Sequence, residues 1–161
     1  MAVPAIISHG LAWWAAAYSD HRLVAVTVRF LHLGALMVGG GTALAMDVKV
    51  LRAARSGADL RLQVLNSLAS SHRVVMPSLV LVVTTGVLMT ASDTTTFFAS
   101  PVYWTKLALV ALLLVNGYGL VVAERLARRG HAWRRLAVGS AASLALWFLT
   151  LFVGTLLTAA A

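Results

Sequence analysis

Four long apolar stretches restrict the architectures open to this chain. They cover about residues 23–46, 74–91, 102–123 and 136–158 of 161. The hydrocarbon core of a bilayer is about 30 Å thick, and a helix of about 20 apolar residues crosses it. Such segments cross lipid as helices because a helix satisfies its own backbone hydrogen bonds. The sequence therefore predicts an all-α, integral membrane four-helix bundle, with residues 1–161 forming a single transmembrane domain.

The amino-acid composition indicates a membrane protein and excludes several classes of cofactor and reaction. The chain is 60% hydrophobic and only 11% charged, whereas soluble domains average about 25% charged residues. It contains no cysteine, which excludes disulfides, Cys-ligated iron–sulfur clusters and covalently attached c-type haem. No glycine-rich phosphate loop, H-E-x-x-H motif or Ser/His/Asp grouping is found, so hydrolytic and nucleotide chemistry have no support.

The basic residues gather in two of the connections between stretches. They are Lys49, Arg52, Arg55 and Arg61 after the first stretch, and Arg125, Arg128, Arg129, Arg134 and Arg135 after the third. The connection at 92–101 has no lysine or arginine. Basic loops remain in the cytoplasm, which predicts a multi-pass protein with both termini on the periplasmic side. The same pattern accounts for the net charge of +8 and argues against nucleic acid as a partner.

Two flanking segments also have helical character. Residues 3–18 are apolar and aromatic but too short to span, and Trp13, Trp14 and Tyr18 suit an interfacial helix on the outer surface. A disordered tail is the alternative. Residues 59–73 carry apolar side chains at helical spacing, so the second helix is predicted to begin near Asp59.

His32 and Lys106 are ionisable side chains inside the stretches, where burial is costly and a functional role is the first hypothesis. With a rise of about 1.5 Å per residue, His32 lies roughly 10–14 Å and Lys106 roughly 5–8 Å below the outer boundary. The two nitrogens therefore share one leaflet and predict a haem or metal site. His9, on the outer segment, is an alternative ligand. His72 lies more than about 20 Å deeper than His32, too far for one haem to bridge.

The small residues near His32 would leave room for a planar ligand such as a porphyrin. Gly39 and its glycine neighbours leave room for a porphyrin face or, alternatively, for close helix packing. Arg29 lies one turn above His32 and would face a haem propionate, unless it extends to lipid phosphate. His32 has its own alternative, a hydrogen bond to a neighbouring carbonyl or hydroxyl group.

Two further polar positions leave alternatives open. Lys106 is close to Tyr103 and Trp104, so it can also be read as a boundary lysine beside an aromatic belt. Asp47, at the inner end of the first stretch, is predicted to pair with Lys49.

Several motifs resemble known families. RFLHLGALMVGGGTALAMDVKVL resembles the first span of small four-span bacterial membrane proteins and of the membrane domain of copper-resistance protein D. Further matches are TTGVLMTASD, SPVYWTKLALVALLLVNG and RRLAVGSAASLALWFLTLFVG, which extend the resemblance over most of residues 23–158. The layout is also similar to the HemJ-type protoporphyrinogen oxidases. That resemblance implies a bacterial inner membrane protein in which His32 and Lys106 ligate b-type haem.

The leading hypothesis is a haem b protein for electron transfer or redox chemistry on a membrane-soluble partner such as a quinone or porphyrin. As an enzyme it would be a haem-dependent membrane oxidoreductase. Copper handling through histidine and methionine is one alternative. The other is a non-catalytic accessory subunit of a larger membrane complex. Self-association into a homo-oligomer stays open.

Overall fold

The computed structural model describes residues 5–131 and 133–160. Within these ranges every regular element is helical. The elements are α1 Ala5–Asp20, α2 Arg22–Ala35, the π-helix η1 Leu36–Gly40, α3 Gly41–Ala53, α4 Ala58–Ser92, α5 Thr94–Ala99, α6 Pro101–Arg128 and α7 Trp133–Ala160. The predicted all-α class is confirmed. Four helices are long and apolar enough to cross a membrane, namely Arg22–Ala53, Ala58–Ser92, Pro101–Arg128 and Trp133–Leu157.

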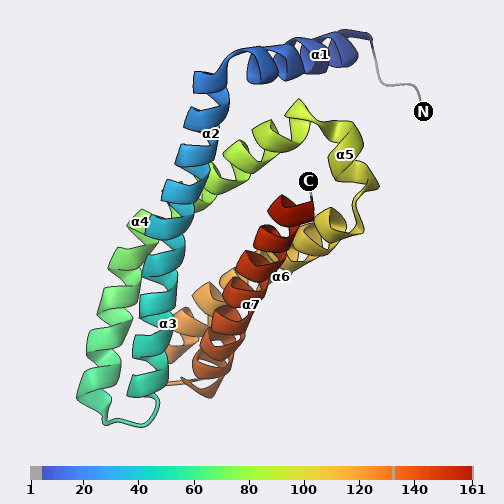
Figure 1. Cartoon of the computed structure of the whole chain (residues 1–161). Coiled ribbons are helices and arrows are strands. Elements are labelled where there is room, and N and C mark those ends of the chain that lie inside the picture. The colour runs from blue at the N-terminus through green and yellow to red at the C-terminus, as the bar shows by residue number, and fades with distance from the viewer. Residues whose placement is uncertain (1–4, 132, 161) are drawn as a thin grey trace.

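The helices form two antiparallel pairs joined along α3 (Figure 1). The continuous rod α2–η1–α3 runs beside α4, and α6 runs beside α7, which also packs on α3. One end of the bundle holds α1, α5 and the C-terminus, and we call it the α1 end (Figure 1). The opposite end holds the α3–α4 and α6–α7 connections, and we call it the turn end.

The helices differ in three ways from the stretches read from hydropathy. They extend beyond the apolar stretches at the turn end, because basic residues continue the helix outside the hydrocarbon. The first span contains the π-helical turn η1, and the connection at 92–101 contains the short helix α5. The start of α4 at Ala58 confirms the prediction of a helix beginning near Asp59. Residues 5–20 are helical, as predicted for the N-terminal segment, while residues 3 and 4 lie outside the described ranges.

Local signals explain where the helices begin and end. Ser100 caps α6 by accepting a hydrogen bond from the Tyr103 amide at 3.4 Å, and Pro101 occupies the first turn, where its missing N–H costs nothing. Gly130 ends the α6 side of the turn with φ at +81°, a left-handed conformation that favours glycine.

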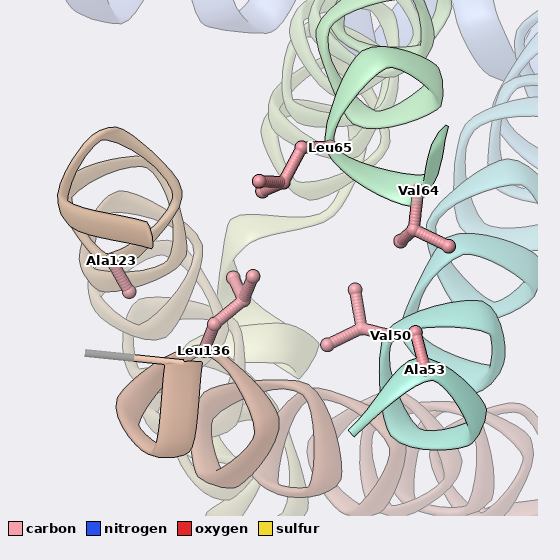
Figure 2. Close-up of a cluster of buried hydrophobic side chains, with 6 residues drawn as sticks. All are labelled: Val50, Ala53, Val64, Leu65, Ala123 and Leu136. Atoms are coloured by element: carbon pink, nitrogen blue, oxygen red, sulfur yellow. The ribbon is translucent and has the colours of Figure 1, made fainter. Parts of the chain in front are cut away.

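The tightest apolar packing lies at the turn end (Figure 2). Side chains of α3, α4, α6 and α7 meet there in one buried cluster, composed of Val50, Ala53, Val64, Leu65, Ala123 and Leu136. Beside it, buried Glu124 on α6 binds Arg128 at 2.8 Å and lies 3.7 Å from His72 on α4. Arg128 also donates to the Leu65 carbonyl, so this group ties α6 to α4.

Asp47 does not form the predicted ion pair with Lys49. It is buried and faces Ser143 and Ser140 on α7, whereas Lys49 is exposed. The physical reason is helical direction, since Asp47 faces α7 while Lys49, two residues on, points away. One carboxylate oxygen of Asp47 has no hydrogen-bond partner in the described structure.

Candidate functional site

His32 lies on α2, one turn before η1, and its ring faces α4. The ring is half-buried. Its Nδ1 is 2.9 Å from the hydroxyl oxygen of Thr85, a residue only 2% exposed. The alternative expectation for His32, a hydrogen bond to a neighbouring hydroxyl or carbonyl group, is therefore met at its Nδ1 nitrogen.

The Thr85 hydroxyl decides which ring nitrogen is protonated. A hydroxyl has one hydrogen to donate, and Thr85 directs it to the Leu81 carbonyl at 2.6 Å. Its oxygen therefore accepts from Nδ1–H of His32. In the neutral imidazole with Nδ1 protonated, Nε2 keeps its lone pair, and no side chain in the described ranges donates to Nε2.

Lys106 lies on α6, about one and a half turns from its start. The side chain is half-buried, and the described structure gives its amine no hydrogen-bond or ion-pair partner. It is close enough to His32 for the two to interact electrostatically. The structure thus brings together the two residues that the sequence singled out.

Two glycines stand beside these side chains. A Cβ on Gly86 of α4 would lie 3.5 Å from Cε1 of His32, and one on Gly154 of α7 would lie 3.7 Å from Cε and Nζ of Lys106. Any side chain larger than methyl would crowd the imidazole or the amine. The helices carrying His32 and Lys106 do not pack closely on each other in the described structure, so a group between them would displace no major helix–helix contact.

The other predicted site residues lie elsewhere. Gly39 is buried, and a Cβ there would overlap the Ser78 side chain on α4, so helix packing takes up its space. Arg29 is exposed, and its Nε donates to the Tyr18 hydroxyl at 3.3 Å, which ties α2 to α1. His9 is exposed on α1 and forms no hydrogen bond to His32 or Lys106 in the part of the chain described.

Sequence reasoning missed Thr85, Gly86 and Gly154. The signal for the first two was the TTG of the second stretch, since a hydroxyl followed by a glycine inside an apolar span is a typical small, polar packing site. Nothing in the sequence indicated that Gly154 adjoins Lys106, because that depends on the packing of α6 against α7.

The described residues contain no group of three His, Cys, Asp or Glu side chains able to hold a metal ion. A haem needs only one or two axial nitrogen ligands, because the porphyrin supplies the other four. The donor set of His32 and Lys106 therefore fits haem better than a bare ion.

No model of a known protein family matches this chain, and neither does any curated protein or solved structure.

Proposed function

We propose that this protein is an integral membrane carrier of one b-type haem, held at the α1 end between α2, α4, α6 and α7. The observation that carries the proposal is the hydrogen bond from His32 to Thr85, which leaves Nε2 available as a ligand. Metal-ligating histidines commonly donate their other ring N–H to a fixed acceptor in this way. The resemblance to HemJ-type proteins and to the membrane domain of copper-resistance protein D supports the same assignment.

The chain's own residues would divide the work of holding the group. His32, oriented by Thr85, and Lys106, as an uncharged amine, would be the two nitrogen donors that hold the haem iron. Gly86 and Gly154 would keep the faces of the site open. Arg29, fixed by Tyr18, would meet a propionate at the edge. When bound, haem supplies reversible one-electron chemistry, and the protein contributes orientation and surroundings.

The activity that follows is electron transfer or a redox step on a membrane-soluble partner such as a quinone or porphyrin. The basic connections at the turn end support a cytoplasmic position for that end, by the positive-inside rule. The haem would therefore lie in the periplasmic half of a bacterial inner membrane, where a lipid-soluble partner reaches it from the bilayer.

The test is the absorption spectrum of protein purified from membranes, oxidised and reduced. We expect a Soret band and a haem b α-band at about one haem per chain. His32→Ala should remove the bands, while His131→Ala, an exposed histidine in the α6–α7 connection, should leave them. Lys106→Arg removes the coordinating amine, because a guanidinium group stays protonated, so it should shift the bands without abolishing binding.

Other results would assign the chain differently. A colourless protein whose copper content depends on histidine and methionine variants would indicate copper handling. A colourless, metal-free protein that co-purifies with larger membrane proteins would indicate an accessory subunit. Either result overturns the haem assignment, as does a Soret band that His32→Ala leaves unchanged.

A further inference from the structure

A groove of about 810 Å³ runs between α6 and α7 toward the turn end, away from His32 and Lys106. Its walls are mostly apolar, with Val122 and Leu126 from α6 and Val138 from α7. Arg134 and Arg135, at the start of α7, line one end. Volumes of about 300–1,000 Å³ are typical of sites that enclose small ligands.

The charge at this end of the groove is not neutralised by the described residues. Arg134 and Arg135 are exposed, and neither forms an ion pair there. The nearest acidic residue along α6, Glu124, is buried and already engaged by Arg128 and His72. Two guanidinium groups at the mouth of an apolar groove are complementary to a ligand with an anionic head and an apolar tail.

The groove lies within the leaflet at the turn end. Its lining on α6 runs from Asn116 to Leu126, ten residues or about 15 Å of helix. Because the third apolar stretch ends near residue 123, the groove begins at the boundary and reaches about 10 Å into a leaflet about 15 Å thick. At the far end, the Asn116 amide donates to the Gly139 carbonyl at 3.0 Å, so this polar pair is satisfied within the protein.

Space is available along the groove. Gly119 lines it, and no atom lies within 4 Å of a Cβ built there. An extended hydrocarbon chain can therefore lie against the backbone of α6 without displacing a side chain.

We propose that this groove binds a single anionic phospholipid from the leaflet at the turn end. Arg134 and Arg135 would hold the phosphate, and one acyl chain would lie between α6 and α7. Basic pockets between membrane helices are known to bind anionic headgroups in this manner. The site is independent of the haem proposal, because it uses none of the same residues.

Native mass spectrometry of the full chain in detergent tests the proposal, with dioleoylphosphatidylglycerol as the probe. Dioleoylphosphatidylcholine has the same acyl chains without net charge and serves as the lipid control. We expect one retained phosphatidylglycerol per chain and little phosphatidylcholine. Replacing both groove arginines (R134Q/R135Q) should weaken retention about tenfold, through loss of two charge-assisted contacts. The control pair R52Q/R55Q, exposed at the other connection, should change it less than about twofold.

A second pair of variants tests the apolar part of the groove without changing charge. Gly119→Leu should fill the groove and weaken retention about fivefold or more, by steric exclusion. Gly117→Leu, on the same helix and with no atom within 4 Å of its Cβ, lies outside the groove and should have little effect. If R134Q/R135Q fails to fold, the Gly119→Leu comparison still decides.

Four results would overturn the proposal. Equal losses of phosphatidylglycerol retention in R134Q/R135Q and R52Q/R55Q would show non-specific electrostatic attraction. Equal retention of the two lipids would show that the headgroup charge does not contribute to binding. Unchanged retention in Gly119→Leu would place the lipid elsewhere. A stable dimer disrupted by Gly119→Leu would show that a second copy of the chain occupies the groove.

Discussion

Thr85 is the hydrogen-bond partner of the His32 ring in the described structure. It is nearly fully buried, donates to its own helix at Leu81 and accepts from the imidazole at 2.9 Å. A hydroxyl in this position fixes both the tautomer and the ring orientation, as second-layer partners of metal ligands commonly do. An ionisable ring inside a bilayer would otherwise carry an unsatisfied donor.

We therefore expect Thr85→Val to weaken haem retention about 10–100-fold, the usual effect of losing such a partner. It should also destabilise the protein by about 1–3 kcal/mol through the unpaired Nδ1–H. Thr85→Ser keeps the hydroxyl and should behave like the parent. Haem titration and thermal unfolding in detergent measure both effects. Equal haem affinity in the valine and serine variants would show that the hydrogen bond does not orient the ligand.

At the residue scale, the sequence identified His32 and Lys106 because lone ionisable groups are conspicuous in apolar helices. It could not identify Thr85, Gly86 or Gly154, since hydroxyls and glycines are common in membrane spans and only packing distinguishes these three. Gly39 shows the reverse case. Its small size was recognised, but the structure places it against Ser78, and its role is helix packing.

At the scale of elements, η1 is the feature that shapes the first span. Its five residues, Leu36–Gly40, form a π-helical turn within an otherwise α-helical rod. Gly39 meets Ser78 on α4, and a Cβ on Gly40 would stand 3.1 Å from the Trp147 ring on α7. The turn therefore lies where three helices approach closely, and π turns often mark such functional positions.

Replacing Gly39 with alanine should destabilise the bundle, because the new methyl group overlaps Ser78. Overpacking of this kind costs about 1–3 kcal/mol. Gly41→Ala is the matched control, since a Cβ there has no neighbour within 4 Å. In helix interiors alanine is favoured over glycine by up to about 1 kcal/mol, so Gly41→Ala should be neutral or stabilising. Thermal melting in detergent distinguishes the two, and a Gly39→Ala melt equal to that of Gly41→Ala would contradict this packing.

The short helix α5 depends on Asp93, which precedes it outside the membrane spans. Hydrogen bonds from the Thr96 side chain, the Thr96 amide and the Thr95 hydroxyl hold the pKa of the Asp93 carboxyl below its ordinary value. The hydrogen bond from the Thr96 amide nitrogen to Oδ1 of Asp93 measures 3.1 Å, and the one from the Thr95 hydroxyl to the same oxygen measures 3.0 Å. The ionised carboxylate thus caps the helix.

Because the folded-state pKa is lowered, the cap is fully effective above the unfolded pKa of about 3.9. Its contribution is lost as pH falls through the folded value. The protection of the α5 amides against hydrogen exchange, measured relative to the intrinsic exchange rate at each pH, should therefore fall under acid conditions in the parent protein. Asp93→Asn retains a capping oxygen but cannot titrate, so it should remove the pH dependence of that protection. The same acid-dependent loss of α5 protection in both proteins would exclude Asp93 as the titrating group.

Much of the element layout was predictable. The four long helices were predicted from hydropathy, and the start of α4 near Asp59 was predicted from the helical spacing of apolar residues. Two features were not accessible: η1, which arises where glycines meet Ser78 and Trp147, and the pairing of Glu124 with Arg128 and His72, which joins residues distant in sequence.

The whole molecule is more open than a soluble protein of its size. Its accessible surface is 10461 Å², whereas a soluble monomer of 17.1 kDa is expected to expose about 7,800 Å². The buried cluster occupies the turn end (Figure 2). At the α1 end, His32 and Lys106 remain only half-buried. The exposed apolar faces of such a bundle are consistent with contact to a lipid bilayer.

Orientation can be tested cleanly because the chain has no native cysteine. Gly57→Cys lies in the exposed α3–α4 connection, and Ala99→Cys is exposed at the end of α5. By the positive-inside rule, a membrane-impermeant maleimide should label Ala99→Cys in intact spheroplasts and Gly57→Cys only after permeabilisation. The opposite labelling pattern would invert the proposed topology and move the proposed haem site to the cytoplasmic half.

The most direct measurement is an experimental density map of the protein purified from its native membrane. The account predicts a planar density at the α1 end, bonded to Nε2 of His32, with Thr85 still on the opposite ring nitrogen. A map in which protein side chains fill the space beside His32 and another group donates to Nε2 would contradict it.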